Sequence, residues 1–121
     1  MEVLLDSSFI ISCMKRKIDF ISQLEELGFR IVVPREVLQE MKDLRQKVTH
    51  DERTAIDLGL KLIENRKVKK VGIGNGRVDE HLIKKGREGA YIASLDNAIK
   101  KMIPNRVLIS DAKNAIVVER E

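Results

Sequence analysis

The sequence predicts an α/β sandwich with three layers, in which helices cover both faces of a mainly parallel sheet. Short runs such as Val3–Leu5 and Ile31–Val33 alternate with longer segments of helical spacing. These runs are apolar at every position, which is typical of strands covered on both faces. The chain has 121 residues. That length fits a single domain over residues 1–121, with room for about five strands and a similar number of helices.

The first half of the chain divides into two strands and three helices. The strand Val3–Leu5 is expected to end at Asp6, a residue type that favours helix N-caps. Residues 9–27 are expected to be helical with a break near Lys15–Lys17, and Gly28 follows the helix end. The other elements expected here are a strand at Ile31–Val33 and helices at Arg35–Lys47 and 52–66.

The second half begins with a short strand expected within Val68–Ile73. A glycine-rich loop follows it, and then a helix over residues 77–88 that ends at Gly89. The later elements expected are a strand at Tyr91–Leu95, a helix at Asn97–Met102, a turn at Pro104 and Asn105, and a strand at Val107–Ser110. Val117 and Val118 are compatible with an added edge strand or with a tail.

The composition excludes several classes of protein and of site. No apolar run approaches the ~18 residues of a membrane span, and the N-terminus lacks the basic region of a signal peptide. The one cysteine, Cys13, excludes an internal disulfide and a multi-cysteine zinc site. The two histidines, His50 in a loop and His81 on the polar side of its helix, disfavour an imidazole site or a Ser-His-Asp triad. We therefore expect a cytoplasmic protein.

Positive charge is concentrated in the second half of the chain. Residues 61–103 carry eleven Lys and Arg against five Asp and Glu, a balance of +6, whereas residues 1–60 carry nine against eleven. A basic segment of this kind can bind a polyanion such as RNA, although a solvated surface explains it equally well. The candidate RNA-binding side chains are Lys69, Lys70, Lys84, Lys85, Lys100 and Lys101.

Acidic side chains follow three of the predicted strands directly, at Asp6, Asp96 and Asp111. Each has a purely structural explanation as a helix N-cap. However, ligands of parallel α/β sheets bind at the carboxyl ends of the strands. Adjacent strands lie only ~4.8 Å apart, so that carboxylates at neighbouring strand ends can share a cation.

Helical phase adds two further carboxylates to this set. Glu40 lies at the margin of the apolar stripe of its helix, whereas Glu36 and Asp43 point further outward. Asp79 falls within the apolar stripe of the 77–88 helix, where a lone carboxylate needs a partner. The alternative is that Asp79 caps this helix. Converging carboxylates repel one another unless a cation compensates, and all-oxygen ligands favour Mg²⁺ or Mn²⁺ over zinc.

Four segments in this order resemble motifs of the PIN-domain family: VLLDSSFI, VPREVLQEM, VDEHLI and YIASLDNAIKKMI. The second and fourth look most like small archaeal-type PIN proteins and the ribosomal-RNA-processing branch. The resemblance implies a sheet ordered 3-2-1-4-5 and cleavage of single-stranded RNA with Mg²⁺ or Mn²⁺. It also implies that the metal-holding acids are Asp6, Glu40, Asp79 and Asp96, with hydroxyl groups at Ser8 and Ser94. The sequence leaves open whether Glu80 or Asp111 replaces one of these ligands.

These observations favour a metal-dependent ribonuclease, with the three aspartates of that set as principal ligands. Glu40 would be a further ligand or the group that orients the attacking water, and either one or two ions are compatible with four acids. One alternative is a non-catalytic RNA- or protein-binding module of an RNA-processing complex. Another is a phosphoacceptor receiver domain, for which Asp111 and Lys113 are a poor match. A homodimer, a toxin paired with an antitoxin, and a ribosome-processing partner all stay open.

Overall fold

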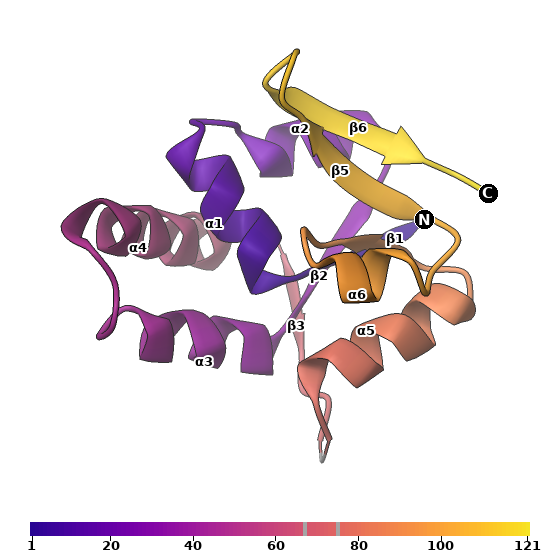
Figure 1. Cartoon of the computed structure of the whole chain (residues 1–121), viewed down its shortest axis with the longest axis horizontal. Helices are drawn as coiled ribbons and strands as arrows, with labels where there is room; N and C mark the ends of the chain where they lie inside the picture. Colours follow the sequence, from indigo (N-terminus) through magenta and orange to yellow (C-terminus); the bar gives the residue numbers. More distant parts are fainter. Residues whose placement is uncertain (67, 75) are drawn as a thin grey trace.

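A six-stranded mixed sheet forms the centre of the computed structural model, which describes residues 1–66, 68–74 and 76–121 (Figure 1). The strand order is β3-β2-β1-β4-β5-β6, and every neighbouring pair is parallel except β5 and β6. This confirms the predicted α/β class and the order 3-2-1-4-5, with β6 as an added edge strand. The strands are β1 (Glu2–Leu5), β2 (Arg30–Pro34), β3 (Lys69–Val71), β4 (Tyr91–Ala93), β5 (Arg106–Ser110) and β6 (Ala115–Glu119).

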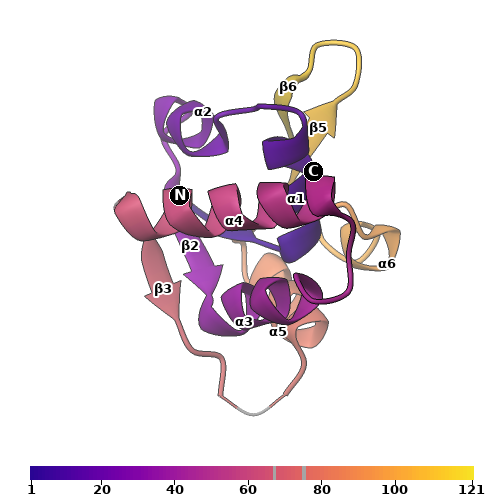
Figure 2. The same cartoon turned by 90° about the vertical axis from the view of Figure 1, so that its left-hand side faces the viewer.

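Helices cover both faces of the sheet, which gives the predicted three layers. Figure 1 shows α1, α3 and α4 on one side and α5 and α6 on the other, and Figure 2 shows α4 running across the first side. The helices are α1 (Ser7–Lys15), α2 (Phe20–Glu26), α3 (Arg35–Leu44), α4 (His50–Asn65), α5 (Val78–Arg87) and α6 (Asn97–Lys100).

Alternating side chains of the strands supply the two halves of the core. In β1, Val3 and Leu5 pack into a cluster with residues of α1 to α4, whereas Leu4 packs on the opposite face with Leu82 of α5 and Ile99 of α6. This is the period of two expected of a strand. The second face thus depends on α5, which carries one of the predicted site residues.

The predicted break between the first two helices is present. Cβ crowding disfavours the left-handed conformation of Lys17, whose φ is 58°, yet the chain turns there between the end of α1 and the start of α2. Asp19 then caps α2 by accepting a hydrogen bond from the Ser22 N–H at 3.1 Å. Lys67 of the basic segment and Asn75 of the glycine-rich loop lie outside the described residues.

Several predicted boundaries were wrong by a few residues. Helix α3 ends at Leu44 rather than at Lys47, whereas β3, at Lys69–Val71, lies within the range predicted for it. Helix α4 begins at His50, so this histidine is helical rather than part of a loop. The reason is the hydroxyl of Thr49, which accepts the Glu52 N–H and caps the helix two residues earlier than expected.

Candidate functional site

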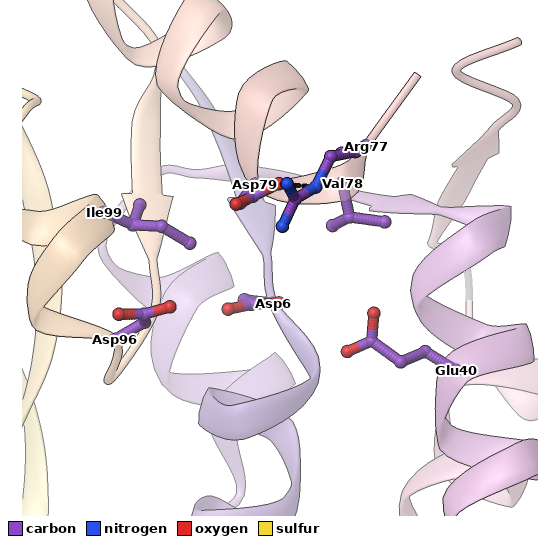
Figure 3. Close-up of a pocket in the computed structure, with 7 residues that line it drawn as sticks. All are labelled: Asp6, Glu40, Arg77, Val78, Asp79, Asp96 and Ile99. Atoms are coloured by element: carbon purple, nitrogen blue, oxygen red, sulfur yellow. Dashed lines mark ion pairs between the residues drawn. The ribbon is translucent and has the colours of Figure 1, made fainter. Parts of the chain in front are cut away.

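A pocket of about 390 Å³ opens at the carboxyl ends of β1 and β4 (Figure 3). Four carboxylates from four different segments line it. Asp6 follows β1 directly, Glu40 comes from α3, Asp79 from α5, and Asp96 caps α6 after β4. The remaining lining residues are Arg77, Val78 and Ile99.

The pairing of β1 with β4 brings two of these acids to one edge of the sheet. The strands are parallel, with Leu5 opposite Ala93, and the backbone N–H of Asp6 donates to the carbonyl of Ala93 at 2.9 Å. Asp96 lies three residues beyond that carbonyl. The two aspartates therefore face the same pocket, as expected from their positions at adjacent strand ends.

Asp6 is the most deeply buried of the four acids, with 8% of its surface exposed. Its carboxylate accepts hydrogen bonds from the Ser7 N–H at 2.9 Å, from the Ser94 hydroxyl at 2.8 Å and from the Ser8 hydroxyl at 3.4 Å. Burial has the largest effect and raises the pKa of Asp6, and the charge of Asp96 raises it further, whereas these hydrogen bonds lower it. A cation in the pocket would favour the ionised carboxylate.

Glu40 is held by a serine that the sequence analysis did not single out. The Ser7 hydroxyl donates to Oε1 of Glu40 at 2.6 Å, across 33 positions of the chain. Ser7 is buried at the start of α1, so this bond ties α1 to α3 beside the pocket. Nothing in the sequence pattern distinguishes Ser7 from the neighbouring Ser8, because the partner lies on a distant element.

The placement of Asp79 differs from the prediction of a buried position within the apolar stripe. Its side chain is 44% exposed. Helix α5 begins at Val78, so Asp79 lies in the first turn, and Leu82 and Gly86 form the buried face. The capping alternative was also wrong, because the N-cap position is Arg77. At this helix end the carboxylate is open to the pocket and accepts the Glu80 N–H at 3.0 Å.

Ser94 connects the two strand-end aspartates. Its fully buried hydroxyl donates to Asp6 and accepts the backbone N–H of Asp96 at 3.1 Å. The Asp96 carboxylate in turn accepts the Ala98 N–H at 2.9 Å and caps α6. The capping explanation for Asp96 is thus correct, and the same side chain also lines the pocket.

Arg77 adds a positive charge that the sequence analysis missed. Its guanidinium extends over the pocket, where Nε lies 3.5 Å from Oδ1 of Asp79 (Figure 3). The loop before it is anchored by Glu36, which accepts the Ile73 N–H at 3.1 Å rather than pointing outward as predicted. The only sequence signal for Arg77 is its position directly before the VDEHLI segment. It partly offsets the negative charge of the four acids.

Three other candidate residues lie outside the pocket lining. The Ser8 hydroxyl accepts the Leu95 N–H at 3.1 Å and lines a neighbouring pocket. Glu80 lines a different hollow on α5. Asp111 was expected at the shared edge but forms an ion pair with Arg16, and its side chain is 84% exposed. The reason is that β5 continues through a hairpin into β6, which carries Asp111 away.

The six candidate lysines do not form one surface. Lys69 and Lys85 line a pocket on the α5 side of the sheet, whereas Lys70 lines a pocket beside α3 and α4. Lys84 lines a third hollow, on α5. Lys69 and Lys70 diverge because successive side chains of a strand point to opposite faces. Lys100 and Lys101 lie at the end of α6.

The donor chemistry of the carboxylate pocket fits Mg²⁺ or Mn²⁺, because its possible ligands are oxygens and no His or Cys lines it. In the positions that the structure describes, however, no three Asp, Glu, His or Cys side chains are placed to hold one ion. Each carboxylate instead accepts hydrogen bonds from nearby serines or backbone N–H groups.

A family model described as a PIN like domain matches residues 3–111. The chain belongs to the PIN-like domain family. This confirms the resemblance drawn from the four sequence segments, all of which lie within the matched range. PIN-like domains are typically nucleases, generally bind RNA and generally use divalent metal ions. A search of curated proteins gave no match. Within the described ranges of this PIN-like domain, no helix combines the length and apolar character needed to cross a membrane.

Proposed function

We propose that this PIN-like domain is a Mg²⁺- or Mn²⁺-dependent ribonuclease that hydrolyses phosphodiester bonds of single-stranded RNA. The observation that carries the proposal is the convergence of four carboxylates on one pocket. Four acids at one place repel one another, and this repulsion destabilises the fold unless a cation or a proton relieves it. A bound divalent cation would relieve this repulsion.

In this proposal Asp6, Asp79 and Asp96 hold the ion, and Glu40 is a further ligand or orients the attacking water. The ion, when bound, supplies a nucleophile from water at neutral pH and offsets the charge that develops on the phosphate. The protein supplies the position of each oxygen. Ser94 fixes the Asp6 carboxylate.

Glu40 is suited to orienting a water molecule because only one of its oxygens is engaged. Ser7 donates to Oε1, and Oε2 accepts no hydrogen bond within the described residues. A water held by Oε2 would face the pocket that the carboxylate lines. The general base of a hydrolytic site must lie within hydrogen-bond reach of the proton it accepts.

Arg77 is suited to binding a phosphate oxygen of the substrate. Its guanidinium lies at the pocket and its side chain is 76% exposed, so that it can turn from Asp79 toward an incoming strand. Arginine binds phosphate through two parallel hydrogen bonds, which also fixes the orientation of the phosphate.

The proposal is tested by cleavage of a labelled single-stranded RNA with Mg²⁺ or Mn²⁺, and with EDTA. We expect activity to require the ion, and Asp79→Asn to lower the rate by roughly a hundredfold or more. The matched control is Asp111→Asn, because this aspartate also follows a strand but lies outside the pocket. Activity that survives EDTA or survives Asp79→Asn would reject the proposal.

One observation favours a second function, namely a non-catalytic RNA-binding module. Among the residues that the structure describes, no three Asp, Glu, His or Cys side chains are placed to hold one ion. Calorimetry with Mn²⁺ separates the two functions. No binding at millimolar Mn²⁺, together with salt-dependent RNA binding, would favour the module.

A further inference from the structure

A pocket of about 200 Å³ lies between α5 and the β2–β3 side of the sheet and shares no lining residue with the carboxylate pocket. Its floor is apolar and consists of Leu4, Val32 and Val71. Lys69, His81 and Lys85 also line it. We call it the His81 pocket.

The register of three parallel strands builds this pocket. Leu4 pairs with Val32, and Val32 pairs with Lys69, so the three side chains form a row on one face of the sheet. Helix α5 packs on that face through Leu82, which clusters with Ile92 of β4. Toward β3 the space between helix and sheet is open and forms the pocket.

His81 brings an unsatisfied polar atom to this place. Its Nε2 atom is buried and has no hydrogen-bond partner among the described residues. A buried polar atom without a partner destabilises a protein, so such atoms are rare and call for an explanation. Helical phase predicted His81 on the polar side of its helix, whereas the structure buries its Nε2 atom beside the sheet. An imidazole nitrogen that faces a pocket can donate to or accept from a bound molecule.

The charges around the pocket favour an anionic ligand. Lys69 forms no ion pair within the described residues, and the pair of Lys85 with Glu88 is long, at 3.7 Å between Nζ and Oε1, and exposed. Glu2 is the single acid in the lining. The pocket thus combines an apolar floor, one unpaired ring nitrogen and two ammonium groups.

The size of the pocket limits what can enter it. Its volume is below the ~300 Å³ at which small-molecule sites usually begin. A single planar ring fits this space better than a whole nucleotide. RNA presents such rings where a single strand is unstacked, with a polar edge on the base and a phosphate on either side.

We propose that the His81 pocket binds one unstacked base of an RNA strand, with the base edge bonded to His81 and the flanking phosphates to Lys69 and Lys85. The proposal rests on the proposed function only in taking RNA as the ligand. It assigns a base-reading position separate from the carboxylate pocket. The two lysines supply affinity, and the imidazole supplies discrimination between bases.

The chain contains a matched control for the charges. Lys70 follows Lys69 in β3 but lies on the opposite face, and Lys84 precedes Lys85 in α5 but lines another hollow. The double variant Lys69→Gln/Lys85→Gln and the control Lys70→Gln/Lys84→Gln therefore have the same net charge and alter the same two elements. Binding of a labelled single-stranded RNA is measured for each by fluorescence anisotropy over a salt series, in EDTA and without cleavage.

We expect the Lys69→Gln/Lys85→Gln variant to lose roughly tenfold or more in affinity at low salt, and its slope of log K against log salt to become shallower by about 1.4. That slope corresponds to two lost phosphate contacts. The control is expected to keep most of its affinity, because the proposal assigns this binding to Lys69 and Lys85 and no longer to Lys70 and Lys84, which line other hollows. Equal losses in the two variants would mean a diffuse charge effect and would overturn the proposal.

His81→Leu tests the discrimination between bases. It puts an apolar side chain of similar size in place of the imidazole and so removes both ring nitrogens. The ranking of short A, C and U oligonucleotides is expected to flatten in this variant, while the salt slope stays unchanged. Because an unsatisfied nitrogen is removed, the thermal midpoint should not fall. An unchanged ranking of the three oligonucleotides would overturn the role of His81.

Two further measurements separate this proposal from the catalytic one. RNA binding is repeated in Asp6→Asn, where the double-variant difference should persist even if cleavage is absent. If the protein binds RNA through the His81 pocket but does not cleave it, the base-binding proposal is supported and the nuclease proposal is rejected. The second measurement is chemical modification of the His81 imidazole in the presence of either RNA or a polyglutamate peptide. Protection by polyglutamate but not by RNA would mean that the ligand class is wrong and would overturn this proposal.

Discussion

The Ser94 hydroxyl donates a hydrogen bond to Oδ2 of Asp6 at 2.8 Å and lies fully buried between two parallel strands. Oγ of Ser94 also accepts a hydrogen bond from the Asp96 N–H, so this one hydroxyl orients the Asp6 carboxylate and fixes the backbone at Asp96. The four-acid pocket therefore depends on a neutral group that does not line it.

Replacing Ser94 by Ala is expected to weaken Mn²⁺ binding by about ten- to a hundredfold, as is common for partners of metal-binding side chains. The reason is that Asp6 loses its shortest hydroxyl donor and rotates more freely. Calorimetry measures the affinity. Ser110→Ala is the control, since within the described residues that hydroxyl only accepts a hydrogen bond from the nearby Lys113 N–H. Equal affinities for Ser94→Ala and the unchanged protein would contradict a role for this hydroxyl.

Because Asp6 is buried, we expect the free energy of unfolding of Asp6→Asn, measured in EDTA, to differ from that of the parent protein by an amount that depends on pH. Burial raises the pKa of Asp6 in the folded state above its value in the unfolded chain. The folded state then binds more protons, so this group's contribution to stability is complete at low pH and falls as pH rises above the unfolded value of about 3.9. Denaturant unfolding between about pH 4 and about pH 7 should show Asp6→Asn gaining stability relative to the parent. A difference that shrinks as pH rises would contradict this sign.

Arg77 is expected to compete with the divalent ion. Arg77→Ala removes a positive charge from beside Asp79, so Mn²⁺ affinity should rise, whereas RNA affinity should fall and the salt slope should become shallower by about 0.7. Opposite changes for metal and RNA distinguish this role from misfolding, which would weaken both. Calorimetry and anisotropy provide the two affinities. Arg87→Ala, at the other end of α5, is the control.

Gly86 is a position where α5 approaches its neighbours closely. A Cβ atom there would lie 2.5 Å from Cγ2 of Ile103 and 3.1 Å from Cγ1 of Ile92. Gly86→Ala is therefore expected to destabilise the fold by ~1–3 kcal/mol in denaturant unfolding. Ile103→Ala, which removes the Cγ2 atom of this contact, should cost less stability in the Gly86→Ala background than in the parent protein. A fully stable Gly86→Ala would show that α5 can shift without penalty.

Cys13 is expected to be inert toward thiol reagents in the native protein. Its side chain is fully buried in the core, and burial raises the pKa of the thiol to about 12. Only the thiolate reacts, so a disulfide reagent at mildly alkaline pH should label the thiol only after denaturation. Rapid labelling of the folded protein would contradict the packing of α1 against the sheet.

Local pattern was sufficient to predict most of the fold. The strands and their parallel order follow from short apolar runs that alternate with helices, and the position of Asp6 and Asp96 at adjacent strand ends brings them to one pocket. Local pattern did not predict the solvent exposure of two of the acidic side chains. Asp79 is open to solvent because α5 begins at Val78, which places Asp79 in the first turn, and Asp111 is carried away by a hairpin.

The contacts that sequence reasoning missed are all made between distant elements. Ser7 meets Glu40 across 33 positions, and Glu36 meets Ile73 across 37. Neither partner of these pairs is distinguished by residue type or by helical phase, since their contact depends on how α3 is oriented over the sheet. The unsatisfied nitrogen of His81 is of the same kind. Its burial depends on how α5 lies over the sheet, which no local pattern encodes.

The edge strand β3 has a consequence unrelated to nucleic acid. It is three residues long, and Lys69 and Lys70 place a positive charge on each of its faces. Open strand edges recruit other chains into shared sheets, and short length with lysine is a common protection against this. The same two side chains therefore help to keep neighbouring molecules from adding to the sheet in a crowded solution.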